Sequence, residues 1–307
     1  MRIVSLLASG TEIAFALGLG DSVVGISHEC DYPPEALDRP RVSRPRFDSV
    51  GRSSAEIDAA VRQARDAYGS VYELDADLLR RLEPDLVLAQ AVCEVCAVPT
   101  PLAGEVARVL EPVPRILSLD AHSLDGILRT VYEVGEAAGA SNRARALVNR
   151  AHERLAAVRK AVAGRPPPSV LAIEWLAPPF LPGHWTPEMI DAAGGLLLGG
   201  VKAGEPSRQV TWADLESLDP DVVIVMPCGF DLATSRRDAD DHAEALQRAA
   251  PQAAAKGQTW IVDGSAYFNR SGPRAVDGVE ILGAVLHPQC FPGVDLTGQA
   301  EVWRPPS

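Results

Sequence analysis

A long amphipathic helix near the middle of the chain constrains the fold more than any other feature. From Ser141 the sequence runs NRARALVNRAHERLAAVRKAV before Gly164 and a proline-rich break. Its apolar residues recur at steps of three and four, and basic residues cover the other face, which is typical of an amphipathic helix. About 22 residues rise roughly 33 Å, the width of a small domain. We therefore expect a stiff connecting helix over residues 141–165, between an N-terminal lobe (1–140) and a C-terminal lobe (166–307).

Both flanking segments alternate short β-branched runs with helical stretches, which predicts parallel sheets. The expected strands are Ile3–Leu7, Val23–Ser27, Leu86–Gln90, Arg115–Leu117, Val170–Glu174, Val222–Met226 and Thr259–Val262. The expected helices, besides the connector, are Thr11–Leu19, Ser54–Tyr68, Ala76–Leu82, Ser123–Ala138, Met189–Ala193 and Pro273–Leu286. The predicted fold is α/β, with two Rossmann-like lobes of mainly parallel sheet joined by the one long helix.

The two halves also repeat a short pattern. LEPDLVL at residues 82–88 resembles LDPDVVI at residues 218–224, and each ends a helix and opens a strand. The shared spacing suggests two copies of one α/β unit.

Composition and charge exclude several classes of protein. The chain is 47% hydrophobic and 23% charged, which excludes disorder and a disulfide scaffold. A net charge of −12 disfavours binding to nucleic acid or an anionic membrane surface. No apolar run approaches the ~20 residues that cross a bilayer, so we expect no membrane insertion.

The N-terminal segment and the cysteines bear on localisation. Glu12 interrupts the first apolar block, and Ser9 and Thr11 occupy expected helix N-cap positions, so a strand, a turn and a helix are predicted rather than a secretory signal. Five cysteines are an odd number, which fits free thiols in a reducing compartment. We expect a cytoplasmic protein; the alternative is a periplasmic or cell-surface protein whose signal lies upstream.

Unusual side chains follow the predicted strands. In open parallel sheets, ligands bind beyond the carboxyl ends of the strands. Two such loops, WLAPPFLPGHW and DGSAYFNRSGPR, hold five of the sixteen aromatic residues. For Trp175 and Trp185 the alternatives are packing in a core and stacking on a ligand. His28 is either a capped loop residue or a ligand contact. Arg270 either anchors the last helix or contacts ligand oxygens. This clustering predicts a cleft for a large flat ligand.

The cysteines allow a second interpretation. Cys93 and Cys96 have the spacing of half a zinc site or of a redox pair. The chain has no second tight pair, so His28, Cys30 and Cys228 complete a metal site only through tertiary contact. A thioredoxin-like dithiol fits the flanking residues poorly. The alternatives are zinc binding, redox chemistry, and buried or cleft-lining thiols.

Motifs for catalysis are absent from the sequence. It has no G-x-S-x-G elbow, no P-loop, no H-E-x-x-H and no glycine-rich dinucleotide fingerprint. We therefore expect a protein that is not an enzyme.

Several segments resemble a known family. RIVSLLASGTEIAFALGLGDSVVGIS followed by CDYPPEA resembles the opening of substrate-binding proteins of cobalamin and iron–siderophore ABC importers, above all the cobalamin binders. LEPDLVLAQ, APPF, AAGG, VTWADLESLDPDVVIV and YFNRSGPRAVDGVEIL follow in the family's order. The resemblance covers nearly the whole chain and implies the class III, helical-backbone periplasmic-binding-protein fold.

The resemblance implies non-enzymatic binding of cobalamin, or of a related corrinoid or tetrapyrrole-like ligand, in the cleft between the lobes. Tyr32, Trp175, Phe268 and Arg270 match the family's motifs. With the loop residues, the predicted ligand-binding set is Ser9, Thr11, His28, Glu29, Tyr32, Cys93, Trp175, Trp185, Phe230, Tyr267, Phe268 and Arg270. An iron–siderophore or haem ligand is the alternative. We expect a monomer that needs no cofactor. If the protein is exported, we expect it to bind an ABC permease.

The sequence also departs from the secreted members. HEC before DYPP, the CEVC loop and the PCGF loop resemble a subgroup without export signals. The segment Arg44–Tyr72 is an insertion relative to compact secreted members, and Gln90 replaces a tryptophan found in some of them.

Overall fold

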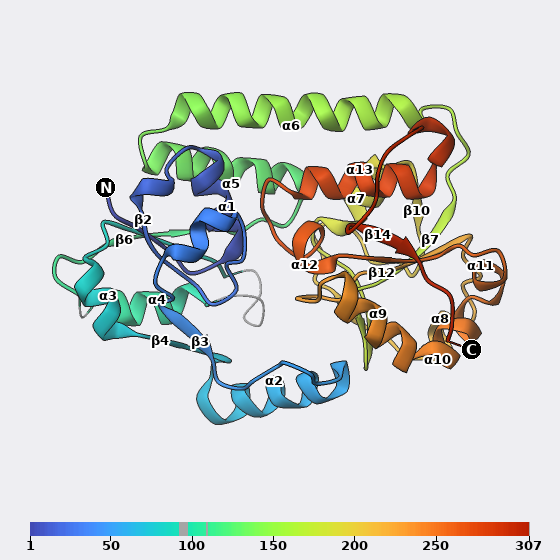
Figure 1. The fold of residues 1–307 in the computed structure, drawn as a ribbon, viewed down its shortest axis with the longest axis horizontal. Helices are drawn as coiled ribbons and strands as arrows, with labels where there is room; N and C mark the ends of the chain where they lie inside the picture. Colours follow the sequence, from blue (N-terminus) through green and yellow to red (C-terminus); the bar gives the residue numbers. More distant parts are fainter. Residues whose placement is uncertain (92–97, 109, 307) are drawn as a thin grey trace.

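The long helix runs along one side of two α/β lobes in the computed structural model, which describes residues 1–91, 98–108 and 110–306 (Figure 1). Helix α6 spans Ser141–Val162, as predicted. Its buried side chains repeat at steps of three and four and form one stripe: Ala144, Val148, Ala151, Leu155, Val158 and Val162. The predicted α/β architecture is confirmed.

The N-terminal lobe is built on a parallel sheet in the order β2-β1-β5-β6. These strands are β1 (Ile3–Ser5), β2 (Val23–Ile26), β5 (Leu86–Ala89) and β6 (Arg115–Ser118). Its helices are α1 (Ala8–Ala16), α2 (Ser54–Tyr68), α3 (Ala76–Leu82), α4 (Thr100–Ala107) and α5 (Leu124–Ala137). A separate antiparallel pair, β3 (Ser43–Pro45) and β4 (Tyr72–Leu74), carries α2 on the side of the molecule opposite α6 (Figure 1).

The C-terminal lobe has a five-stranded sheet in the order β10-β7-β12-β13-β14, of which β14 alone is antiparallel to its neighbour. The strands are β7 (Ser169–Ile173), β10 (Leu196–Leu197), β12 (Val222–Val225), β13 (Thr259–Val262) and β14 (Ala300–Val302). A small antiparallel sheet comprises β8 (Trp175–Leu176), β9 (Pro179–Leu181) and β11 (Arg208–Gln209). The helices are α7 (Thr186–Ala192), α8 (Trp212–Leu215), α9 (Leu232–Asp241), α10 (Ala243–Ala249), α11 (Pro251–Ala255), α12 (Gly264–Tyr267) and α13 (Ala275–Leu286).

The repeated sequence pattern forms the same turn in both lobes. Glu83 and Asp219, each just before the Pro-Asp pair, have positive φ angles of 41° and 42°. The aspartate that follows accepts a backbone N–H bond in each lobe: Asp85 from Arg2 (2.6 Å) and Asp221 from Ser169 (2.8 Å). Since the first strand of each lobe also lies between the lobe's second and third parallel strands, the structure supports the predicted internal repeat.

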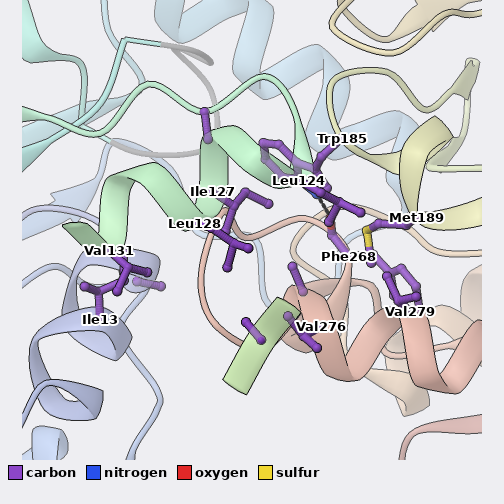
Figure 2. Close-up of a cluster of buried hydrophobic side chains, with 14 of the residues drawn as sticks. Ile13, Leu124, Ile127, Leu128, Val131, Trp185, Met189, Phe268, Val276 and Val279 are labelled. Carbon is purple, nitrogen blue, oxygen red and sulfur yellow. Dashed lines mark hydrogen bonds between the residues drawn. The ribbon is translucent and has the colours of Figure 1, made fainter. Parts of the chain in front are cut away.

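One hydrophobic core extends through both lobes. Figure 2 shows the buried side chains of α5 gathered with those of α7 and α13, which belong to the other lobe. The Leu124 amide at the start of α5 donates to the Glu188 carboxylate on α7 over 2.6 Å. Arg154 on α6 also pairs with Asp277 and Glu280 on α13. The two lobes are therefore joined by packing as well as by the connecting helix.

The first helix begins earlier than predicted. Helix α1 begins at Ala8, and its N-cap is Leu7, which makes no side-chain capping bond. Ser9 and Thr11 therefore lie inside the helix, and their assignment as N-caps is wrong. Both are buried, so packing of this face decides where the helix begins rather than capping. Among the described residues, no helix combines the length and the apolar character needed to cross a bilayer.

Candidate functional site: a cavity between the lobes

A cavity of about 740 Å³ lies between the two lobes, and aromatic rings form its wall on the C-terminal lobe. Trp175 on β8, Phe180 on β9 and Phe230 after β12 come from loops and short strands at the carboxyl ends of β7 and β12. The Trp175 and Phe230 ring centroids are 5.1 Å apart and the rings are tilted by 49°. The Trp175 indole N–H donates to the Ala177 carbonyl over 3.1 Å, which fixes the ring orientation. This arrangement offers aromatic surface to a flat ligand.

The opposite wall comes from the N-terminal lobe and mainly from the segment around α2. Phe47, Ile57, Val61 and Tyr72 line this side of the cavity. Ile57 and Val61 are four residues apart, so they share one face of the helix. The cavity therefore has apolar side chains from both lobes in its lining. Polar groups complete its lining: Glu29, Ser49, Asp58, Arg62, Arg65, Gln90, Glu174, His184, Thr186, Ser207, Gln209 and Asn269.

His184 stands out among the polar residues of the lining. It has a positive φ of 51°, and its buried Nδ1 has no hydrogen-bond partner within the described part of the chain. Its ring centroid lies 5.7 Å from that of His122, which belongs to the other lobe. Burial lowers the pKa of His184, and the nearby His122 lowers it further. The side chain is therefore held as neutral imidazole at neutral pH.

A network of ion pairs joins the lobes beside this cavity. Arg270 of the C-terminal lobe pairs with Asp31 (2.5 Å) and with the buried Glu12 (3.4 Å), both of the N-terminal lobe. Arg274 binds the same Glu12 carboxylate over 2.6 Å, and its guanidinium lies 4.2 Å from the centre of the Tyr32 ring. Arg270 also lines a small cavity of about 50 Å³ with Ser9 and Asn269.

The electrostatics of the network favour its charged forms. Burial would raise the pKa of Asp31, but the hydrogen bond and charge of Arg270 outweigh burial and leave that pKa below its ordinary value. The pKa of Glu29 is lowered in the same way, because hydrogen bonding to His28 and nearby positive charge outweigh burial. Burial opposes the charge on Arg270, yet its acidic partners raise its pKa above the ordinary value. The Arg270–Asp31 pair therefore stays ionised at neutral pH and braces the two lobes.

Residues 3–257 match the family described as periplasmic binding protein. The chain belongs to the periplasmic binding protein family. Over 296 residues it is 24% identical to an uncharacterized ABC transporter substrate-binding lipoprotein of Bacillus subtilis, covering 94% of this chain and 81% of the relative. A 42-residue segment, 14% of this chain and 15% of the relative, is 55% identical to the vitamin B12-binding protein of Vibrio cholerae.

Solved structures of this family share the fold over nearly their whole length. A periplasmic heme binding protein from Pseudomonas aeruginosa superposes with a TM-score of 0.73 at 20% identity, covering 99% of this chain and 98% of the other. The periplasmic vitamin B12 binding protein of Vibrio cholerae superposes with a TM-score of 0.67 at 22% identity, covering 94% and 97%. The predicted family resemblance is confirmed. The family is one of solute-binding proteins.

In this binding protein, five of the predicted ligand-binding residues line the large cavity: Glu29, Trp175, Trp185, Phe230 and Phe268. Two of them are buried and packed against other side chains. Phe268 is fully buried, and Trp185 is 8% exposed and donates its indole N–H to the Phe268 carbonyl over 2.7 Å. Both pack in the core shared by the lobes (Figure 2). Of the two tryptophans considered, the structure therefore places Trp185 in the core and Trp175 on the cavity.

Other predicted residues are held by neighbours within the protein. Thr11 contacts the Cys30 sulfur at 3.0 Å, and Ser9 contacts Ser271 at 3.3 Å. Tyr32 and Tyr267 both lie against Arg274. The Ser9 and Tyr32 contacts cross between the lobes, whereas the Thr11 and Tyr267 contacts each stay within one lobe. A direct role in ligand binding stays a prediction for each of these residues.

The predicted metal set is dispersed as far as the structure describes it. Cys93 and Cys96 lie outside the described residues. Cys30 is fully buried, and burial raises the pKa of its thiol, which opposes the thiolate form that binds zinc. The His28 Nδ1 lies 2.8 Å from the Ser43 hydroxyl, whereas Cys228 lies on the cavity wall. Within residues 1–91, 98–108 and 110–306, no three His, Cys, Asp or Glu side chains gather to hold a metal.

The sequence interpretation missed several residues of the cavity. Phe180 lies in the same aromatic and proline-rich loop as Trp175, so its position after a predicted strand was a usable signal. Ile57 and Val61 lie on a predicted helix, but nothing in its periodicity shows that this helix faces the other lobe.

Proposed function

We propose that this protein binds a corrinoid, or a related tetrapyrrole-like ligand, in the cavity between its lobes without transforming it. The observation that carries the proposal is the wall formed by Trp175, Phe180 and Phe230 around a cavity of about 740 Å³. Ligand pockets of roughly 300–1,000 Å³ bury most of a small molecule's surface. A large flat ring system gains most from such a wall, because aromatic and apolar faces bury its surface on both sides.

Cobalamin is the first candidate, and haem is its rival. The short segment shared with a vitamin B12-binding protein favours a corrinoid. Similarity in fold to both vitamin B12 and heme binding proteins keeps both ligands in the test. Cobalamin and haem differ in the substituents at the edges of their rings. We therefore expect the polar side chains that line the cavity to select between the two ligands.

The proposal includes delivery of the ligand to an ABC permease outside the cytoplasmic membrane. Relatives named as a substrate-binding lipoprotein and as periplasmic proteins support this location. The cytoplasmic location expected from the sequence finds no support among them. Fractionation of cells that express the native gene tests this: recovery in the cytosolic fraction alone would contradict the delivery role.

The binding experiment titrates the purified protein with cyanocobalamin, hemin and a ferric siderophore, followed by visible absorbance and calorimetry. Trp175→Ala should weaken binding of the true ligand about tenfold to hundredfold, since one aromatic face supplies about 1–3 kcal/mol. Tyr132→Ala, an exposed aromatic on α5, is the matched control and should leave the affinity unchanged. Absence of heat and of spectral change for all three compounds at high micromolar concentration would overturn the proposal.

A further inference from the structure

Helix α2 closes one side of the ligand cavity and also reaches the opposite lobe. It has 15 residues, about 22 Å of helix, and lies on the side of the molecule away from α6 (Figure 1). Its Ile57 and Val61 line the cavity on one side, while Trp175, Phe180 and Phe230 line it on the other. A ligand in this cavity is therefore enclosed between α2 and the aromatic wall of the C-terminal lobe.

The two ends of α2 are held differently. At its C-terminal end, Ala64 packs in the core of the N-terminal lobe with Val71 and Tyr72. The guanidinium of Arg46 lies 4.6 Å from the centre of the Tyr68 ring and pairs with Glu73 on β4 over 2.5 Å. This end of the helix is a firm part of its own lobe.

The N-terminal end of α2 rests on the C-terminal lobe through a buried hydrogen bond. The Ser54 hydroxyl donates to Oδ1 of Asp238 on α9 over 2.7 Å. Ser54 is fully buried and Asp238 is 4% exposed, so water competes poorly for the bond. The second oxygen of Asp238 has no hydrogen-bond partner within the described part of the chain, which makes the Ser54 donor more valuable.

A glycine with a positive φ angle lies on each side of α2. Gly51 and Gly69 flank the helix with φ angles of 73° and 68°, in a region that other residues rarely adopt. Both positions face open space. Gly51 therefore gives the chain before the N-terminal end of α2 conformational freedom, while the C-terminal end stays packed on its own lobe.

We propose that α2, which forms the wall on the N-terminal lobe, is the lid of the ligand cavity, and that the Ser54–Asp238 hydrogen bond is the latch that holds it on the C-terminal lobe. The inference rests on the proposed function, because it assigns Ile57 and Val61 to contact with the bound tetrapyrrole-like ligand. Breaking the latch frees the N-terminal half of the helix, while the packing around Ala64 keeps the other half in place.

The first test needs no ligand. Hydrogen exchange of the full protein is compared for the wild type, Ser54→Ala and the control Gln63→Ala, which changes an exposed residue of the same helix. Loss of a buried hydrogen bond to a carboxylate should speed exchange over residues 54–61 about tenfold or more and leave α6 unchanged. Unchanged exchange in Ser54→Ala would overturn the latch, and equal acceleration in α6 would show general destabilisation instead.

The second test measures ligand release by stopped-flow absorbance, with cyanocobalamin and hemin as probes. Ser54→Ala should raise the dissociation rate of the bound probe about tenfold, and Ile57→Ala should weaken its affinity about tenfold, whereas Gln63→Ala changes neither. If the wild type binds a probe, and Ser54→Ala and Ile57→Ala release it at the wild-type rate and bind it with the wild-type affinity, the lid is overturned while the binding function stands. If the wild type binds no probe, the proposed function fails, and the exchange experiment alone decides the latch.

Discussion

At the residue scale, the charged groups between the lobes show what a local sequence pattern leaves out. Arg270 and Tyr32 belong to a network centred on Glu12, and their contact with a ligand stays a prediction. In the sequence, Glu12 only interrupts an apolar block. Its partners are 258 and 262 residues away, so local sequence pattern contains no sign of the pairing.

Removing the charge of Glu12 should therefore weaken the whole fold. Glu12→Gln leaves Arg270 and Arg274 without the buried carboxylate that both contact. Loss of one partner of a buried ion pair typically costs about 3–5 kcal/mol of unfolding free energy. Glu216→Gln, which loses a solvent-exposed pair with Arg248, should cost less than about 1 kcal/mol. Urea denaturation of both variants measures the difference, and equal losses would show that the interlobe network stabilises little.

His184 should make stability depend on pH below neutrality. Its pKa is lowered in the folded protein, so the unfolded chain binds the proton more readily. Stability is complete above the unfolded pKa of about 6.5 and falls as the pH drops below it, by a fraction of the 1.4 kcal/mol per pH unit that a single proton allows.

The variant His184→Asn separates this effect from the rest of the protein. Asparagine tolerates the positive φ at this position and does not titrate. The fall in unfolding free energy between pH 7.5 and 5.5 should be smaller in this variant than in the wild type. Identical pH profiles from urea titrations would contradict the assignment.

At the scale of elements, three helices were predicted to the residue, and those between residues 232 and 267 were missed. Helices α2, α3 and α6 have the predicted bounds; α2 begins with a capping box formed by Ser53 and Glu56, whereas α6 begins without a side-chain cap. Helices α9 to α12, between residues 232 and 267, are short, and the sequence reading placed no helix there. Their positions depend on packing against β13 and the lobe core, which a single sequence does not reveal.

The buried apolar side chains of α6 should contribute more to the free energy of unfolding than its ion pairs do. Leu155 is 2% exposed in the core, so Leu155→Ala should cost about 2–5 kcal/mol through lost burial and a cavity. The Arg154 side chain is 42% exposed, and Arg154→Ala should cost less than about 1 kcal/mol although the residue pairs with two carboxylates. Chemical denaturation of the two neighbouring variants tests this order, and a larger loss for Arg154→Ala would reverse it.

At the scale of the whole molecule, the sequence predicted two lobes and a long connecting helix. The structure adds a hydrophobic core that continues from one lobe into the other. Val131 of the N-terminal lobe and Val276 of the C-terminal lobe belong to one buried cluster (Figure 2). The periodicity of each helix showed which face is buried, but it did not show that α5 and α13 bury their faces in the same place.

A shared core predicts that the protein unfolds as one unit. If the lobes were independent, each would melt at its own temperature, and the van't Hoff enthalpy would fall well below the calorimetric enthalpy. Because α5, α6, α7 and α13 pack in one cluster, unfolding of either lobe exposes apolar surface of the other. Scanning calorimetry of the ligand-free protein should show a single transition with the two enthalpies nearly equal. Two resolved transitions would mean that the lobes are coupled only by the connecting helix, and ligand binding would then have to draw them together.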